Sequence, residues 1–133
     1  MLRIITFSLP LLLVAACTPV EGNATYSERQ AQKLAAALEG MQPGETRRCI
    51  DKVRVNRVDS AAGKFLFVQG RNKVAVTDAT GCPGAASGDL LVFETTVSSS
   101  YCSGDIVRTR SRTGGMLTGT CALRDFTEYS RPE

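Results

Sequence analysis

Histidine and tryptophan are both absent from this 133-residue sequence, and aromatic residues make up only 6% of it. Without an imidazole there is no Ser/His/Asp triad, no Cys/His pair and no His-ligated zinc site. These absences remove much of the chemistry by which small proteins act as hydrolases. We therefore expect a protein that is not an enzyme and that carries no cofactor.

The sequence also lacks a large excess of charge of either sign. Without Arg3, which belongs to the leader described below, fifteen Lys and Arg side chains face thirteen Asp and Glu. A nearly neutral domain creates no overall field that attracts nucleic acid, so we expect no nucleic-acid partner. The 43% of apolar residues is typical of a packed globular chain, and the length leaves room for one domain.

A short apolar run from Ile4 to Ala16 follows the basic Arg3. This layout is typical of a secretion signal, and the run is too short to cross a bilayer comfortably as a permanent helix. Its end, Val-Ala-Ala before Cys17, resembles the bacterial lipobox. The resemblance implies that residues 1–16 are a lipoprotein signal peptide, removed by cleavage before Cys17, and that this cysteine becomes acylated.

Acylation at Cys17 would make the mature protein a membrane-anchored lipoprotein. Each buried CH₂ contributes about 0.8 kcal/mol, so two or more acyl chains form an effectively permanent anchor. Thr18 rather than Asp follows the cysteine, which resembles the pattern of lipoproteins sorted to the outer membrane. We expect the protein on the periplasmic face of that membrane, with the polar residues 17–26 as its tether.

Residues 27–41 are predicted to form an amphipathic helix. Ser27 and Gln30 match a capping box, and Gly40 is suited to ending the helix. Leu34 and Leu38 recur at helical spacing and form a narrow apolar stripe. The stripe either docks on the core of the same domain or binds a partner helix, and we favour the first interpretation.

Residues 45–129 are predicted to form a disulfide-bonded β domain. Short β-branched and aromatic runs alternate there with turn residues, and no helical crossover separates them, which favours antiparallel pairing. We therefore expect a mainly β fold: a small antiparallel β-barrel or sandwich of about six strands, with one N-terminal helix and two disulfides. The predicted strands are 49–58, 64–70, 73–78, 90–97, 105–110 and 116–123, with a further short strand at 126–129.

Four cysteines remain once Cys17 is acylated: Cys49, Cys82, Cys102 and Cys121. An even number of cysteines in an oxidising compartment predicts two disulfides. No close CxxC pair is present, so we expect no metal site. Spacing does not choose among the three possible pairings. We favour Cys82 with Cys102, which would leave Cys49 to join the first strand to the last at Cys121.

The four cysteines also lie in a familiar order of short segments. These are Cys-Ile at 49, Cys-Pro-Gly at 82, Cys-x-Gly-Asp at 102 and Cys-x-Leu-x-x-Phe at 121. Together they resemble a family of small proteobacterial secreted or lipoprotein domains of unknown function, over about residues 48–126. The resemblance implies a β-rich envelope domain and assigns no activity to any residue.

A basic strand face is the strongest candidate binding site in the sequence. Lys52 and Arg54 alternate with valines, as Arg108, Arg110 and Arg112 alternate with other residues, and alternation places such charges outward. If the two strands are neighbours, five cations line one surface. Such a surface could hold anionic glycolipid phosphates or an acidic envelope protein, whereas the commoner role of such charges is a solvated face.

Two function hypotheses fit these observations. The first is a non-enzymatic, lipid-anchored module of the cell envelope that binds an envelope protein or an anionic glycolipid. The second is an inhibitor of a lysozyme-like or other hydrolase, by analogy with small disulfide-bonded lipoproteins of that kind. We favour the first, because the motif of such inhibitors is not present in this sequence.

Asp105 could form a catalytic carboxylate pair with Asp51, but capping of backbone N–H groups is its commoner role.

Overall fold

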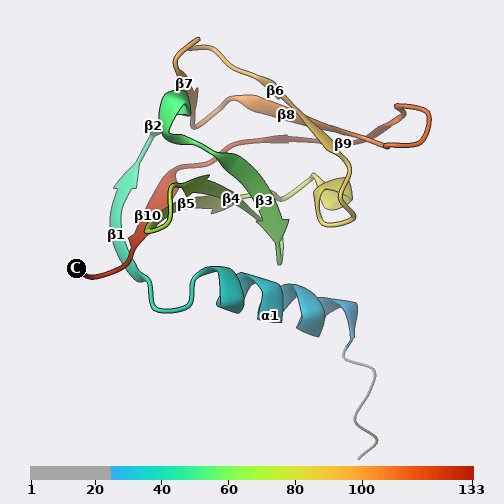
Figure 1. The fold of residues 1–133 in the computed structure, drawn as a ribbon. Coiled ribbons are helices and arrows are strands. Elements are labelled where there is room, and N and C mark those ends of the chain that lie inside the picture. The colour runs from blue at the N-terminus through green and yellow to red at the C-terminus, as the bar shows by residue number, and fades with distance from the viewer. Residues whose placement is uncertain (1–24) are drawn as a thin grey trace, which may run out of the picture.

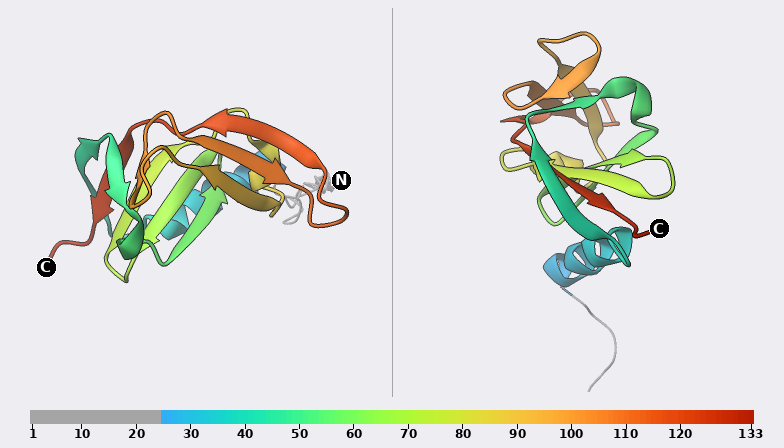
Figure 2. Two further views of the ribbon diagram at one scale, coloured as in Figure 1. Left: turned by 90° about the horizontal axis from the view of Figure 1, so that it is seen from above. Right: turned by 90° about the vertical axis from the view of Figure 1, so that its left-hand side faces the viewer.

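The computed structural model describes residues 25–133. The predicted signal peptide, the predicted acylation site Cys17 and residues 18–24 of the predicted tether lie outside the described residues. The chain forms three layers, in which a five-stranded sheet lies between a helix and a second group of strands (Figures 1 and 2). The predicted mainly β, antiparallel architecture with one helix and two disulfides is confirmed, and the sheets do not close into a barrel.

The described residues form one α-helix and ten strands, all paired antiparallel. Strand order is β1-β10-β5-β4-β3 in the largest sheet, β2-β7 in the smallest and β6-β8-β9 in the third. The elements are α1 (Tyr26–Ala37), β1 (Gln42–Arg47), β2 (Cys49–Asp51), β3 (Arg57–Ala61), β4 (Lys64–Gln69), β5 (Lys73–Asp78), β6 (Leu90–Glu94), β7 (Ser100–Cys102), β8 (Ile106–Arg110), β9 (Leu117–Ala122) and β10 (Phe126–Ser130).

The main core lies between the five-stranded sheet and the other two sheets. Phe67 of β4 is completely buried there, and its ring lies 5.8 Å from that of Phe93, 5.1 Å from that of Tyr101 and 5.4 Å from that of Phe126. Successive side chains of a strand point to opposite faces, so Leu66 faces the other way, into a second core beneath α1. Both faces of β4 are therefore covered.

Helix α1 covers the second face of the five-stranded sheet. Leu34 and Leu38 pack against the second core, which confirms the self-docking interpretation. The Lys33 ammonium also donates a hydrogen bond of 2.8 Å to the backbone carbonyl of Ser60 on β3. Within the described residues, no helical segment has the length and apolar character that a membrane crossing requires.

The N-terminal cap of α1 differs from the predicted one. The cap is Thr25 rather than Ser27: its hydroxyl accepts from the backbone N–H of Glu28, and the Glu28 carboxylate accepts from the N–H of Thr25 at 2.7 Å. A carboxylate at this position forms a charge-assisted hydrogen bond and interacts favourably with the helix dipole, which the neutral amide of Gln30 does not match. The helix also ends at Ala37, before the predicted boundary at residue 41.

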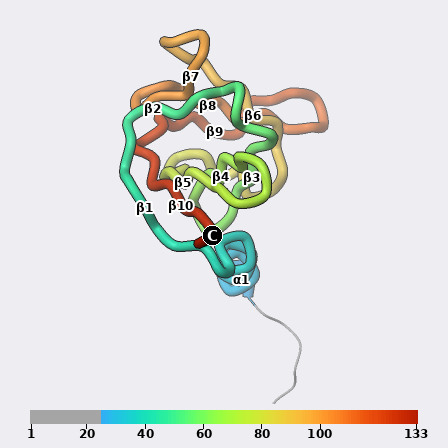
Figure 3. Tube along the Cα trace, turned by 60° about the vertical axis from the view of Figure 1, so that its left-hand side comes forward, coloured from blue at the N-terminus to red at the C-terminus, as the bar shows by residue number. Residues whose placement is uncertain are grey.

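Strand boundaries differ from the prediction in several places. The predicted strand 49–58 is broken by a 3-10 turn over Lys52–Arg54, which allows β2 to pair with β7 while β3 pairs with β4. β1 was not predicted, because its polar sequence lacks apolar alternation. β7 begins at Ser100, in a segment for which no strand was predicted. The chain rises from β1 into β2 along one side and so joins the two layers (Figure 3).

The two disulfides join Cys49 to Cys102 and Cys82 to Cys121, so the favoured pairing was wrong. Cys49 and Cys102 lie directly opposite each other in the antiparallel pair of β2 and β7. Cys121 lies on β9, which runs beside the Gly81 turn that precedes Cys82. The prediction required the first strand to lie beside the last, whereas the break at residues 52–54 places β2 beside β7.

Candidate functional site

The structure does not bring the five predicted binding cations onto one surface. Lys52 and Arg54 lie in the 3-10 turn after β2, and β2 pairs only with β7. Arg108 and Arg110 lie on β8, between β6 and β9. The condition on which the basic face depended, that the two segments are neighbouring strands, is therefore not met.

Lys52 is held by its own neighbourhood. Its ammonium donates to the Thr95 hydroxyl at 2.6 Å and to the backbone carbonyl of Ser98 at 3.1 Å, and it lies 5.1 Å from the centre of the Tyr101 ring. These contacts close the loop between β6 and β7. Because the lysine is already engaged on several sides, its role in this fold is to hold the loop.

The arginines of β8 do point outward, as the alternation predicted. Val107 and Thr109 are fully buried, whereas Arg108 and Arg110 are exposed on the opposite face of the strand. The guanidinium of Arg108 forms an ion pair with the Glu94 carboxylate at 3.1 Å. Arg110 donates a 3.0 Å hydrogen bond to the carbonyl of Gly115. These contacts orient both guanidinium groups on the sheet surface.

Arg112 follows the end of β8 and does not continue the row. Its Nε donates a 2.6 Å hydrogen bond to the backbone carbonyl of Gly88 in the loop before β6. Arg54, at the other predicted location, has its Nε 3.9 Å from the Asp51 carboxylate. Both side chains are exposed, and each contacts a nearby loop or turn.

Exposed apolar side chains flank the β8 arginines on both sides. In the strand register, Arg110 lies between Leu90 of β6 and Leu117 of β9, and Arg108 lies opposite Val92 of β6. Leu90 is 52% exposed and Leu117 is 56% exposed. We call this surface the distal face and define it by Leu90, Val92, Arg108, Arg110 and Leu117.

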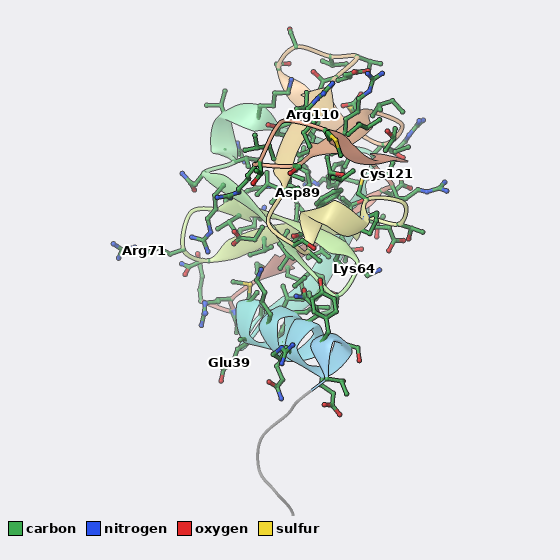
Figure 4. The ribbon with its side chains drawn as sticks, turned by 90° about the vertical axis from the view of Figure 1, so that its right-hand side faces the viewer. Glu39, Lys64, Arg71, Asp89, Arg110 and Cys121 are labelled. Carbon is green, nitrogen blue, oxygen red and sulfur yellow. A yellow bond between two sulfur atoms is a disulfide. The ribbon has the colours of Figure 1, made fainter. Side chains whose placement is uncertain are left out.

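The distal face lies on the side of the molecule away from α1. Figure 4 shows Arg110 at one end of the molecule and Glu39, which follows the helix, at the other. Met116 is 72% exposed and directly precedes Leu117. Four of the seven exposed large hydrophobic side chains among residues 25–133 therefore lie on β6 or at the start of β9. Exposed apolar side chains that gather on one face of a folded domain mark an interaction site more often than scattered ones do.

The apolar part of the distal face was missed at the sequence level. The segment Leu90–Glu94 carries apolar side chains at four consecutive positions, so its alternation does not distinguish a buried face from an exposed one. In the fold, Leu91 and Phe93 pack on the main core while Leu90 and Val92 point outward. The sequence signal was the run of four consecutive apolar residues, which is typical of a strand with both faces covered.

Asp105 is buried and serves the loop around β7. One carboxylate oxygen accepts from both the N–H and the hydroxyl of Thr96 at 2.9 Å, and the other accepts from the N–H of Cys102 at 2.8 Å. Burial raises the pKa of Asp105, but these hydrogen bonds and the charge of Lys52 more than offset it, so the pKa lies below its ordinary value. The carboxylate therefore stays ionised and organises backbone.

The described residues form neither a catalytic carboxylate pair nor a metal-binding cluster. Asp51, the proposed partner of Asp105 in a carboxylate pair, accepts a hydrogen bond from the N–H of Val53 and caps the 3-10 turn. Among residues 25–133, no three His, Cys, Asp or Glu side chains lie close enough together to hold a metal ion.

No protein-family model, no curated protein and no solved structure matches this chain. The function must therefore be inferred from the geometry of the chain itself.

Proposed function

We propose that this protein is a non-enzymatic module of the bacterial cell envelope, anchored by lipid at Cys17, that binds another envelope protein through the distal face. The observation that carries the proposal is the row of exposed leucine, valine and arginine side chains across β6, β8 and β9. Leu90 and Leu117 are about half exposed on this sheet. A partner that covers them gains the free energy of apolar burial.

The composition of the distal face favours a protein partner over a glycolipid. Protein interfaces are enriched in aromatic residues, methionine and arginine and depleted of lysine. The face carries Arg108 and Arg110, has Met116 at its margin, and contains no lysine. Because Arg108 is already paired with Glu94, one of its two cations is neutralised before any phosphate could bind.

The position of the distal face also favours a partner away from the anchoring membrane. Residues 17–24 precede the described chain, and an extended segment of that length spans at most about 28 Å. The described chain begins at Thr25 beside α1, beneath the five-stranded sheet, whereas the distal face lies on the other side (Figure 1). An anchor at Cys17 therefore leaves the distal face free to meet a partner in the periplasm.

Photo-crosslinking in the native envelope tests this proposal. A photoreactive amino acid replaces Val92 or Leu117 in the full acylated chain, and mass spectrometry identifies the adducts. A matched control places the same probe at Glu39, which is exposed beside α1. We expect one dominant protein adduct from both distal positions and none of that protein from the control.

Other adducts would overturn the assignment. Lipid-only adducts at Val92 and Leu117 would indicate a glycolipid-binding face instead. The same proteins captured at Glu39 as at the distal positions would indicate random collision. A hydrolase captured specifically by the distal positions would support the inhibitor hypothesis, and its activity could then be titrated with the purified chain.

A further inference from the structure

A second surface feature lies between α1 and the five-stranded sheet. A cavity of about 380 Å³, open to solvent, lies between the sheet and the end of α1 at Ala36 and Ala37. Its apolar lining includes Leu66 and Val74, which are 1% and 3% exposed. This volume falls within the range of small-ligand sites, about 300 to 1,000 Å³.

Three arginines from separate parts of the chain line the same cavity: Arg57 at the start of β3, Arg71 in the turn between β4 and β5, and Arg131 after β10. Arg71 extends outward from its turn (Figure 4). These three arginines add positive charge to a lining that is otherwise mostly apolar. The arrangement suits a ligand that is anionic at one end and apolar at the other.

The counter-charge within the chain is incomplete. Among the described residues that line the cavity, Asp59 is the single acidic one, and it pairs with Arg57 at 2.8 Å. Arg71 and Arg131 form no ion pair within residues 25–133. Two guanidinium groups thus remain for an external anion, and a guanidinium matches the oxygens of a phosphate through paired hydrogen bonds.

The cavity lies on the side of the molecule that bears α1, at whose start the chain emerges from the predicted tether. The helix has 12 residues and is therefore about 18 Å long. The inference rests on the lipid anchor proposed above, which would bring the far end of the helix within reach of the membrane surface. We propose that this cavity binds the headgroup of an anionic glycerophospholipid. Arg71 and Arg131 hold its phosphate, and the apolar lining takes the adjacent glycerol and first methylene groups.

Vesicle binding by the mature chain tests the inference. The variant Cys17→Ser removes the acyl anchor, so that binding reports only on the folded domain. Co-sedimentation compares vesicles of phosphatidylglycerol and phosphatidylcholine in equal parts with vesicles of phosphatidylcholine alone. We expect the chain to bind the vesicles that contain phosphatidylglycerol. The double variant Arg71→Gln/Arg131→Gln should lose roughly tenfold or more in affinity, because each cation near an anionic surface contributes substantially to the free energy of binding.

The matched control is Arg108→Gln/Arg110→Gln, which removes the same charge from the distal face. We expect its affinity to stay within about twofold of the parent, since charges beyond about 10 Å from a surface are screened at moderate salt. An equal loss in both double variants would show that total charge alone drives binding and would overturn the inference.

A cavity-filling variant separates the cavity from the surrounding surface. Ala37→Phe keeps every charge and occupies the space beneath the helix, so we expect it to weaken vesicle binding while thermal unfolding confirms that the domain remains folded. Unchanged affinity in Ala37→Phe would overturn the cavity as the site. Complete displacement by inorganic phosphate at matched phosphate concentration would overturn the lipid assignment in favour of a soluble ligand.

These results are independent of the crosslinking at Val92 and Leu117, because the cavity and the distal face share no residue. Failure at one surface therefore leaves the proposal for the other standing.

Discussion

The five-stranded sheet and the three-stranded sheet both carry apolar side chains on two faces, but only the first has both faces covered. β4 has Phe67 towards the main core and Leu66 towards α1, and both are buried. β6 has Phe93 towards the main core and Val92 towards solvent. On a folded domain, a group of exposed apolar side chains is a candidate site for a partner.

The helix side and the distal side of the molecule also differ in which elements cover them. On the helix side, α1 contributes leucines to the second core and its Lys33 contacts the edge strand β3. On the distal side, no described element lies over β6, β8 and β9 (Figure 2). The comparison predicts that substitutions in the covered sheet affect stability, whereas substitutions on the distal face affect association.

The largest effect is expected from Phe67→Ala. The ring is fully buried against three other aromatic rings, so its removal leaves a cavity and should lower the free energy of unfolding by about 3 to 5 kcal/mol. Urea unfolding measures the change, with Leu117→Ala as the exposed control. Similar losses in both variants would break the distinction between the two sheets.

Removal of either disulfide is expected to cost about 2 to 4 kcal/mol. The bridges span 53 and 39 residues in sequence, and the two loop-closure entropies are therefore similar. Paired alanine substitutions at Cys49 and Cys102, and at Cys82 and Cys121, are compared by chemical unfolding. Peptide mapping under non-reducing conditions identifies the native pairs, and a Cys82–Cys102 linkage would contradict the structure.

Asp105→Asn should lower stability by about 1 to 3 kcal/mol, because a buried hydrogen-bond acceptor loses its charge and part of its pairing. The pKa of Asp105 is lowered in the folded state, so its contribution is present above the unfolded value of about 3.9 and disappears as the pH falls through the folded pKa. Unfolding at a series of pH values should show less acid sensitivity in the variant. Asp51→Asn, at an exposed turn, provides the control.

Leu117→Asp is expected to change stability by less than about 0.5 kcal/mol, because the side chain is exposed in the monomer. Its effect should fall on association, since it places a carboxylate in the proposed interface. Crosslinking from a probe at Val92 measures the association. The adduct should disappear in the variant, while the midpoint of unfolding stays unchanged. Persistence of the adduct would remove Leu117 from the interface.

Much of the β domain was predictable because many of its strands are specified by residues close together in the sequence. The runs at 64–69, 73–78 and 106–110 combine alternation with strong turn residues at their ends, and each was predicted within one or two residues. The outward direction of Arg108 and Arg110 follows from the same alternation. β1 and β7 were missed because polar strands derive their pairing from neighbours rather than from their own composition.

The sequence by itself determined the count of cysteines available for bridges, the apolar stripe of the helix and the outward arginines of β8, since each depends on residues close together in the chain. Only the tertiary structure decided which cysteines meet, which strands neighbour β8 and which apolar face is left uncovered. Those outcomes depend on pairings between segments far apart in the chain, where one break at residues 52–54 redirects β2 to β7. The residue pattern within a strand does not identify the strand that it will pair with, because any antiparallel neighbour can form the same backbone hydrogen bonds.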